Sequence, residues 1–104
     1  MYTVVMASEI RFEWDRHKDA ANRRKHGISF AEAQTAFSDE RALFMSDPEH
    51  SEKEDRFILL GMSASLRTLV VCHGYRAQDE IIRIISARKA NRLERAAYGR
   101  GRQR

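Results

Sequence analysis

The chain contains few of the residues that crosslink or interrupt a polypeptide, with one cysteine and one proline in 104 residues. A single cysteine, Cys72, excludes an internal disulfide, and its apolar neighbours predict a small buried side chain. No apolar run approaches the roughly 18 residues that a membrane-spanning helix needs, and no signal-peptide pattern opens the chain. This length fits a single core. We therefore expect one small cytoplasmic domain without a membrane segment.

Positive charge is in excess, with a formal net charge of +4. It is unevenly placed, because residues 11–25 and 76–100 are basic whereas residues 47–55 are acidic. Such an arrangement fits a groove for a polyanion, although the acidic and basic segments could also pair with each other. We expect residues 100–104, with three arginines, to be a disordered basic tail.

The first half of the chain predicts two helices. Residues 1–9 could be a weak strand or an extension that precedes the compact domain of residues 10–99. Alternation over residues 10–14 predicts a short strand, and a helix follows over residues 16–26, between Asp15 as its N-cap and Gly27 as its stop. A second helix begins at the capping box formed by Ser29 and Glu32.

The second half predicts a sheet and a closing helix. The strands are expected at residues 41–45, 56–62, 67–75 and 80–87. Their connections include two of hairpin size, so antiparallel neighbours are expected. A last helix is predicted over residues 89–98, before Gly99. The predicted fold is α+β, with two N-terminal helices, a four-stranded antiparallel sheet and a C-terminal helix.

Residues 81–91 are the most informative segment. Its β-branched residues predict a buried strand, yet Arg83 lies in the middle and Arg88 follows where the strand ends. A buried guanidinium stays charged and needs a partner, which could be a bound anion or an acid such as Glu54. Alternation puts the two arginines on opposite faces, unless the backbone turns after Ser86.

Several motifs occur in a characteristic order. They are Phe12-Glu13-Trp14-Asp15, Asn22 with Lys25-His26-Gly27-Ile28-Ser29-Phe30, Asp47 with His50-Ser51, Glu54-x-Arg56, Gly61, and Arg83-Ile84-Ile85-Ser86-Ala87-Arg88-Lys89-Ala90 with Glu94 and Tyr98. Together they resemble the BrnT toxin family of type II toxin–antitoxin systems. The resemblance implies a RelE-like fold, RNA cleavage without a metal, and neutralisation by a BrnA-type antitoxin. That antitoxin would carry a ribbon-helix-helix part, through which alone the complex would contact operator DNA.

RNA cleavage without a metal needs a base, an acid, and cations that stabilise the charged transition state. The planar fork of arginine meets two phosphate oxygens at once, so Arg83 and Arg88 are the first candidates for the cations. Glu54 and Arg56 share a strand face by alternation. They could serve as base and clamp, or form an exposed ion pair of little energetic weight.

The remaining candidates have structural alternatives of comparable weight. Lys25 and His26 end a helix, where the dipole alone favours cations, but an imidazole can act as acid or base near neutral pH. Possible RNA contacts are Lys89, Arg76, Tyr98 and His73. A tyrosine can stack on an unpaired base, and Tyr98 and His73 could equally be packed in the core.

The histidines and the cysteine lack metal-site spacing, so we expect no metal and no cofactor. Two functions remain open from the sequence. The first is a ribonuclease toxin that inhibits translation and growth. The second is a non-catalytic module that binds only a partner protein, or DNA as part of a repressor complex.

Overall fold

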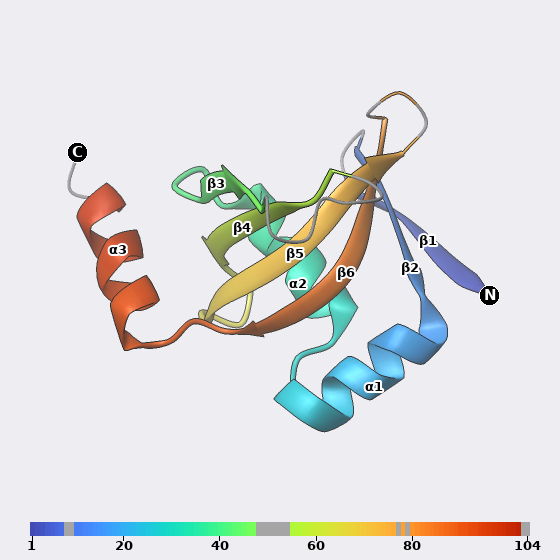
Figure 1. Ribbon diagram of the computed structural model, residues 1–104, viewed down its shortest axis with the longest axis horizontal. Coiled ribbons are helices and arrows are strands. Elements are labelled where there is room, and N and C mark those ends of the chain that lie inside the picture. The colour runs from blue at the N-terminus through green and yellow to red at the C-terminus, as the bar shows by residue number, and fades with distance from the viewer. Residues whose placement is uncertain (8–9, 48–54, 77, 79, 103–104) are drawn as a thin grey trace.

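The structure is a computed structural model that describes residues 1–7, 10–47, 55–76, 78 and 80–102. Its centre is a six-stranded sheet with the strand order β1-β2-β6-β5-β4-β3 (Figure 1). The strands are β1 (Tyr2–Ala7), β2 (Ile10–Asp15), β3 (Leu43–Ser46), β4 (Phe57–Met62), β5 (Thr68–Arg76) and β6 (Ile81–Lys89). Neighbours are antiparallel except β2 and β6, which run parallel. The expectation of four antiparallel strands is therefore wrong.

Strands β1 and β2 account for the difference. Phe12 and Trp14 of β2 are buried in the core, so β2 joins the sheet beside β6. A parallel neighbour requires a long crossover, whereas the short connections visible in the sequence indicate only antiparallel pairs. β1 pairs with β2 along its whole length, and Val5 packs against the core. Residues 2–7 therefore extend the sheet.

Helix α1 (Arg16–His26) has the bounds that its caps predict. The Asp15 carboxylate accepts hydrogen bonds from the backbone N–H groups of His17 (2.7 Å) and Lys18 (3.3 Å). At the other end Gly27 adopts a φ of 72°, a left-handed conformation that glycine tolerates better than other residues. Local sequence therefore determined this helix completely.

Helix α2 (Phe30–Thr35) continues into a 3-10 turn, η1 (Ala36–Ser38). The hydroxyl of Ser29 accepts a hydrogen bond from the N–H of Glu32 at 3.0 Å, so half of the expected capping box forms. The carboxylate of Glu32 instead binds Arg67 and the hydroxyl of Ser63, which lie on the turn between β4 and β5. The hydrogen bond from Arg67 lowers the pKa of Glu32. This ion pair ties α2 to the β4–β5 turn.

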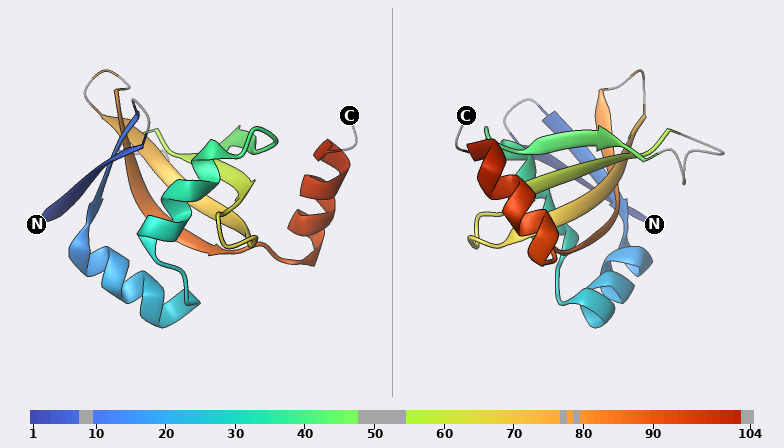
Figure 2. Two further views of the ribbon diagram at one scale, coloured as in Figure 1. Left: turned by 180° about the vertical axis from the view of Figure 1, so that it is seen from behind. Right: turned by 60° about the vertical axis from the view of Figure 1, so that its left-hand side comes forward.

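The sheet has an apolar surface on each face. On one face, residues such as Phe12, Leu59 and Ile84 form the main core with Phe30 of α2. Figure 2 shows α2 crossing this face. On the opposite face, Leu60 and Val70 pack with Tyr98 of helix α3 (Arg92–Arg102). We call these the α2 face and the α3 face.

Helix α3 begins and ends later than the sequence predicted. β6 continues through Lys89, and Asn91 then forms an unexpected capping box with Glu94: each backbone N–H donates to the other side chain at 2.8 Å. The helix passes Gly99 and ends at Arg102, so residues 100–102 are helical where we expected a disordered tail. None of the described helices is long and apolar enough to cross a membrane.

Candidate functional site

A β-bulge brings the two arginines of β6 to the same face of the sheet. Cys72 pairs with Ser86 and His73 pairs with Ile84, so Ile85 is an extra residue that reverses the alternation of β6. Arg83 and Arg88 therefore oppose Gly74 and Val70, which share one face of β5. The expectation of opposite faces, made for an ideal strand, is wrong. Because Val70 and Gly74 are four residues apart, the two arginines are separated by roughly 13 Å along the sheet.

Three of the predicted catalytic residues line one pocket of about 290 Å³ on the α3 face. They are His26 from the end of α1, Arg56 directly before β4, and Arg88 from the end of β6. The other lining residues are Asp47, Ile58, Val70, Cys72, Ile85, Ser86 and Ala87. We call this site the arginine pocket. It gathers one imidazole and two guanidiniums from three distant segments, and the guanidiniums suit a phosphate ligand.

Asn22 places the end of α1 against β6. Its side-chain amide donates hydrogen bonds to the carbonyls of Ile28 and Ala87, both at 2.8 Å, and its oxygen accepts from the N–H of Ala87 at 3.1 Å. β2 pairs with β6 only as far as Arg83. Beyond that point the side chain of Asn22 forms the hydrogen bonds to the N–H and the carbonyl of Ala87 that a neighbouring strand would otherwise form. His26 lies one helical turn beyond Asn22, and this attachment brings it to the arginine pocket.

Arg88 is held by helix α3. Its guanidinium donates to both carboxylate oxygens of Glu94, at 2.7 and 2.8 Å. This hydrogen-bonded pair raises the pKa of Arg88 and lowers the pKa of Glu94. Both groups therefore stay ionised at neutral pH. The bidentate contact fixes the direction of the guanidinium and offsets part of its charge.

Asp47 was not predicted as a site residue, although it belongs to one of the BrnT-like motifs. It lies one residue beyond β3 and lines the arginine pocket. Its backbone N–H donates to the carbonyl of Arg56 at 2.8 Å, so the β3–β4 pairing brings both residues to the same end of the sheet. In the sequence, the signal that could have indicated Asp47 as a site residue was its position just after a predicted strand. Glu54, the carboxylate that we predicted instead, lies outside the described residues.

The other predicted cations do not line the arginine pocket. Arg83 donates to the hydroxyl of Tyr2 at 2.6 Å and lies 5.2 Å from its ring centroid. Glu54, one of its two predicted partners, lies outside the described residues. Arg76 pairs with Glu13 at 3.0 Å on the same face. Lys25 is exposed on α1.

Lys89 lies on the other face of the sheet, opposite Leu69, a residue of the main core. Its charge contributes to the lowered pKa of Glu32, which is consistent with a position on the α2 face. The α3 face therefore carries four of the predicted arginines, which are Arg56, Arg76, Arg83 and Arg88. Lys89 is separated from them by the sheet.

His73 and Tyr98 are buried, so the structure gives no support to their predicted contacts with RNA. His73 has no exposed surface; its ring lies 4.8 Å from that of Phe37, and its Nδ1 donates to the carbonyl of Val71. Tyr98 is 5% exposed and donates its hydroxyl to Asp39 at 2.5 Å. Both side chains hold elements together, which was the alternative that the sequence left open.

The buried His73 should make the protein less stable in mild acid. Burial lowers the pKa of His73 below its ordinary value of 6.5, so the unfolded chain binds a proton more tightly. Its contribution to stability is complete above pH 6.5 and is lost as the pH falls through the folded pKa. We expect His73→Phe, which keeps a ring among aromatic neighbours but cannot titrate, to lose less stability between pH 7 and pH 5. Urea unfolding of both proteins at the two pH values measures this.

The acidic groups with shifted pKa values give an internal control for that experiment. Glu32 and Glu94 have a pKa lowered from 4.5. The stability that these two carboxylates contribute is therefore lost at a lower pH than the contribution of His73. If wild type and His73→Phe lose the same free energy of unfolding between pH 7 and pH 5, the acid sensitivity comes from groups other than His73.

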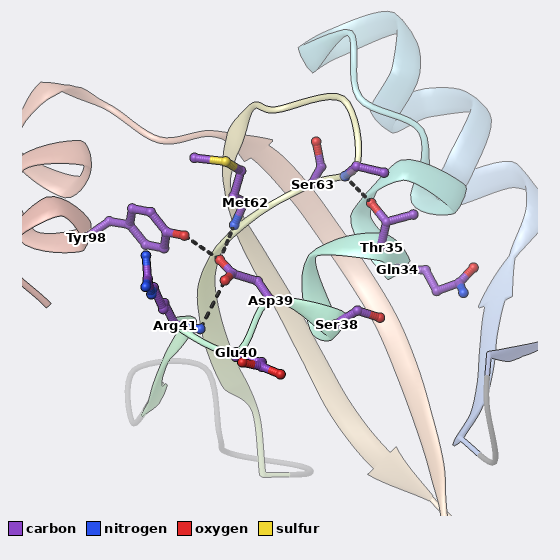
Figure 3. A pocket seen from close by; sticks show the side chains of 10 residues that line it. Gln34, Thr35, Ser38, Asp39, Glu40, Arg41, Met62, Ser63 and Tyr98 are labelled. Atoms are coloured by element: carbon purple, nitrogen blue, oxygen red, sulfur yellow. Dashed lines mark hydrogen bonds between the residues drawn. The ribbon is translucent and has the colours of Figure 1, made fainter. Parts of the chain in front are cut away.

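A larger pocket of about 680 Å³ lies at the opposite end of β4, between η1, the β4–β5 turn and α3 (Figure 3). Asp39 lies within it and accepts hydrogen bonds from Tyr98, from the N–H of Met62 at 2.9 Å and from the N–H of Arg41 at 3.0 Å. Asp39 and Glu40 outnumber Arg41 among its charged lining residues. This negative balance disfavours a polyanion, so the smaller arginine pocket is the better candidate.

Among the residues that the structure describes, no three histidine, cysteine, aspartate or glutamate side chains are grouped so that they could hold a metal ion. The chemical groups available in the arginine pocket are an imidazole, a carboxylate, a thiol, a hydroxyl and two guanidiniums. An imidazole and a carboxylate can exchange protons with a ligand, and the guanidiniums can bind its negative charge.

A cationic pocket on one sheet face of a small α+β domain defines a protein suited to bind a polyanion. Residues 14–94 match the family described as "Ribonuclease toxin, BrnT, of type II toxin-antitoxin system". The chain therefore belongs to the BrnT family.

A solved structure supports this assignment. The crystal structure of the Brucella abortus ribonuclease toxin BrnT, at 1.1 Å resolution, matches with a TM-score of 0.55 and 25% sequence identity. The match covers 76% of this chain and 94% of the Brucella chain. No curated protein matches by sequence.

Proposed function

We propose that the chain is an endoribonuclease toxin that cleaves RNA in the arginine pocket without a metal ion. The observation that carries the proposal is the meeting of His26, Arg56 and Arg88 in one pocket of a BrnT-family domain. These residues come from three segments that the fold alone brings together. Their chemistry matches what cleavage of a phosphodiester requires.

In this reaction the 2′-oxygen of a ribose attacks the adjacent phosphorus, and the bond to the 5′-oxygen of the next nucleotide breaks. His26 and Asp47 are the proton-transferring groups of the pocket. One removes the 2′-OH proton and the other donates a proton to the leaving 5′-oxygen. Arg56 and Arg88 stabilise the extra negative charge on the phosphorane-like transition state. Arg83 and Arg76, on the same face, contact neighbouring phosphates of the strand.

The proposal predicts RNA cleavage in the presence of EDTA. Purified protein free of its antitoxin is incubated with RNA in EDTA and in Mg²⁺, and the fragments are resolved by electrophoresis. We expect similar cleavage rates in both buffers and fragments with 5′-OH ends, because the pocket supplies the acid and the base. Activity that vanishes in EDTA and returns with Mg²⁺ would contradict metal independence, and intact RNA in both buffers would contradict catalysis.

The cellular role follows from the family description, which names a type II toxin–antitoxin system. We propose that RNA cleavage in the cytoplasm inhibits translation and arrests growth. The partner is then an antitoxin of the BrnA type, with a ribbon-helix-helix part that binds operator DNA. The fold is proposed to be RelE-like.

The bidentate contact between Glu94 and Arg88 favours a second candidate function. An arginine that is paired with a carboxylate of its own chain can be structural, and the domain would then be a non-catalytic module that binds a partner protein. Production of the chain alone distinguishes the two functions. Growth arrest is expected of a toxin, and normal growth with stable, soluble protein is expected of a binding module.

A further inference from the structure

An apolar groove of about 240 Å³ lies between α3 and the α3 face of the sheet. We call it the α3 groove. It shares Ile58, Val70 and Arg88 with the arginine pocket, so the two sites are continuous. Its other lining residues are Met45, Leu60, Leu93, Glu94 and Ala97. One ligand could therefore occupy both sites at once.

The chemistry of the α3 groove suits protein side chains better than RNA. Leu93 is 80% exposed and Met45 is 47% exposed, although both are large and apolar. None of the described residues that line the groove is aromatic, so it offers no ring on which a base could stack. Aliphatic side chains lose water favourably in such a groove, whereas ribose and phosphate do not.

The charges around the α3 groove define the partner further. Arg88 lies where the groove meets the arginine pocket, and Arg56 lies in that pocket. Glu94 also lines the groove and pairs with Arg88. A complementary surface carries aliphatic residues with carboxylates on the side that faces the arginine pocket. An amphipathic helix with one acidic edge has this composition.

We infer that the α3 groove is the docking site of the antitoxin. An amphipathic segment of the antitoxin places aliphatic side chains beside Leu93 and Met45, and a neighbouring carboxylate enters the arginine pocket. The bound antitoxin then covers the groups that would contact RNA, so inhibition and binding are one event. This inference rests on the proposed function, which supplies both the RNA and the antitoxin.

A second apolar surface provides the alternative. On the edge strand β1, Tyr2, Val4 and Met6 are 43%, 56% and 60% exposed. They lie at the opposite edge of the sheet from β3, beside β2. None of the three lines the α3 groove or the arginine pocket, so a partner bound only there would leave the pocket open.

The test uses the full chain co-expressed with the antitoxin of its own operon, then separated and remixed in a calorimeter without RNA. The groove variants are Leu93→Gln and Met45→Gln, on α3 and β3. The matched controls are Val4→Gln on β1 and Leu66→Gln on the β4–β5 turn, where Leu66 is 79% exposed. Each substitution replaces an exposed apolar side chain and leaves the net charge unchanged, so RNA cleavage should stay near the wild-type rate.

We expect each groove variant to weaken antitoxin binding by roughly 30-fold, the effect of losing a 2 kcal/mol hot spot, while both controls bind as wild type does. Met45 lies on β3, so Met45→Gln still tests the groove if Leu93→Gln disturbs the folding of α3. Wild-type affinity in both groove variants, or a loss confined to Val4→Gln, would overturn the inference. The proposed function is tested separately, because calorimetry needs no cleavage: a chain that cuts no RNA but loses antitoxin through Leu93→Gln would refute the nuclease and keep the docking site.

Discussion

Arg56→Ala is expected to lower the rate of RNA cleavage by about 10²–10³-fold, the usual cost of removing one group that stabilises transition-state charge. Arg56 lies directly before β4 and lines the arginine pocket with His26 and Arg88. Its guanidinium is expected to bind two phosphate oxygens as negative charge develops on them. Arg56→Lys should recover only part of the activity, because an ammonium group cannot form the bidentate contact. Single-turnover cleavage of a short RNA measures both rates.

The matched control for this loss is Arg24→Ala. Arg24 is exposed on α1 and does not line the pocket. Both substitutions remove one positive charge, so they lower the net charge that attracts RNA by the same amount. An equal loss of activity in the two variants would show that net charge, rather than the pocket, determines cleavage. Thermal unfolding of each variant confirms that the comparison is made on folded protein.

The largest effect on stability is expected from Asn22→Leu, at about 3 kcal/mol or more. The substitution removes the hydrogen bonds to the carbonyls of Ile28 and Ala87 and to the N–H of Ala87. Asn22 is 7% exposed, so water cannot readily replace them, and each unsatisfied buried group costs about 1–3 kcal/mol. Urea unfolding measures the change.

Two further variants make the result specific. Asn91→Ala removes the exposed capping side chain of α3 and should cost only about 1 kcal/mol. Asn22→Asp keeps an acceptor for the N–H of Ala87 but sets a carboxylate against two carbonyl oxygens, so it should also be strongly destabilising. A cost for Asn22→Leu no larger than that for Asn91→Ala would show that Asn22 does not hold α1 to β6.

Helix α1, whose signals are local, was predicted well. Asp15 and Gly27 fixed the bounds of α1 because a cap acts on the backbone within a few residues of itself. The strands β4, β5 and β6 were also predicted within a few residues, since short connections leave antiparallel pairing as the natural outcome. Membership of the BrnT family could be recognised from the same motifs that the fold now places together.

The sheet edge and the site depended on contacts between distant residues. The parallel pairing of β2 with β6 joins residues about 70 positions apart, which no local pattern encodes. The burial of His73 likewise depends on aromatic rings from other strands and from η1. Lys89 was expected in the last helix, whereas β6 pairs with β5 as far as Lys89 and alternation then puts it on the other face from Arg88.

The sequence by itself determined the chemical groups: arginines within and after a β-branched strand, a histidine at the end of a helix, and the caps that set that helix. Only the tertiary structure decided which of them meet. One extra residue, Ile85, turns Arg83 and Arg88 to the same face, and Asn22 brings His26 to β6. The reason is physical: a bulge appears only once two strands pair, and a buried amide gains its partners only when a helix and a strand dock.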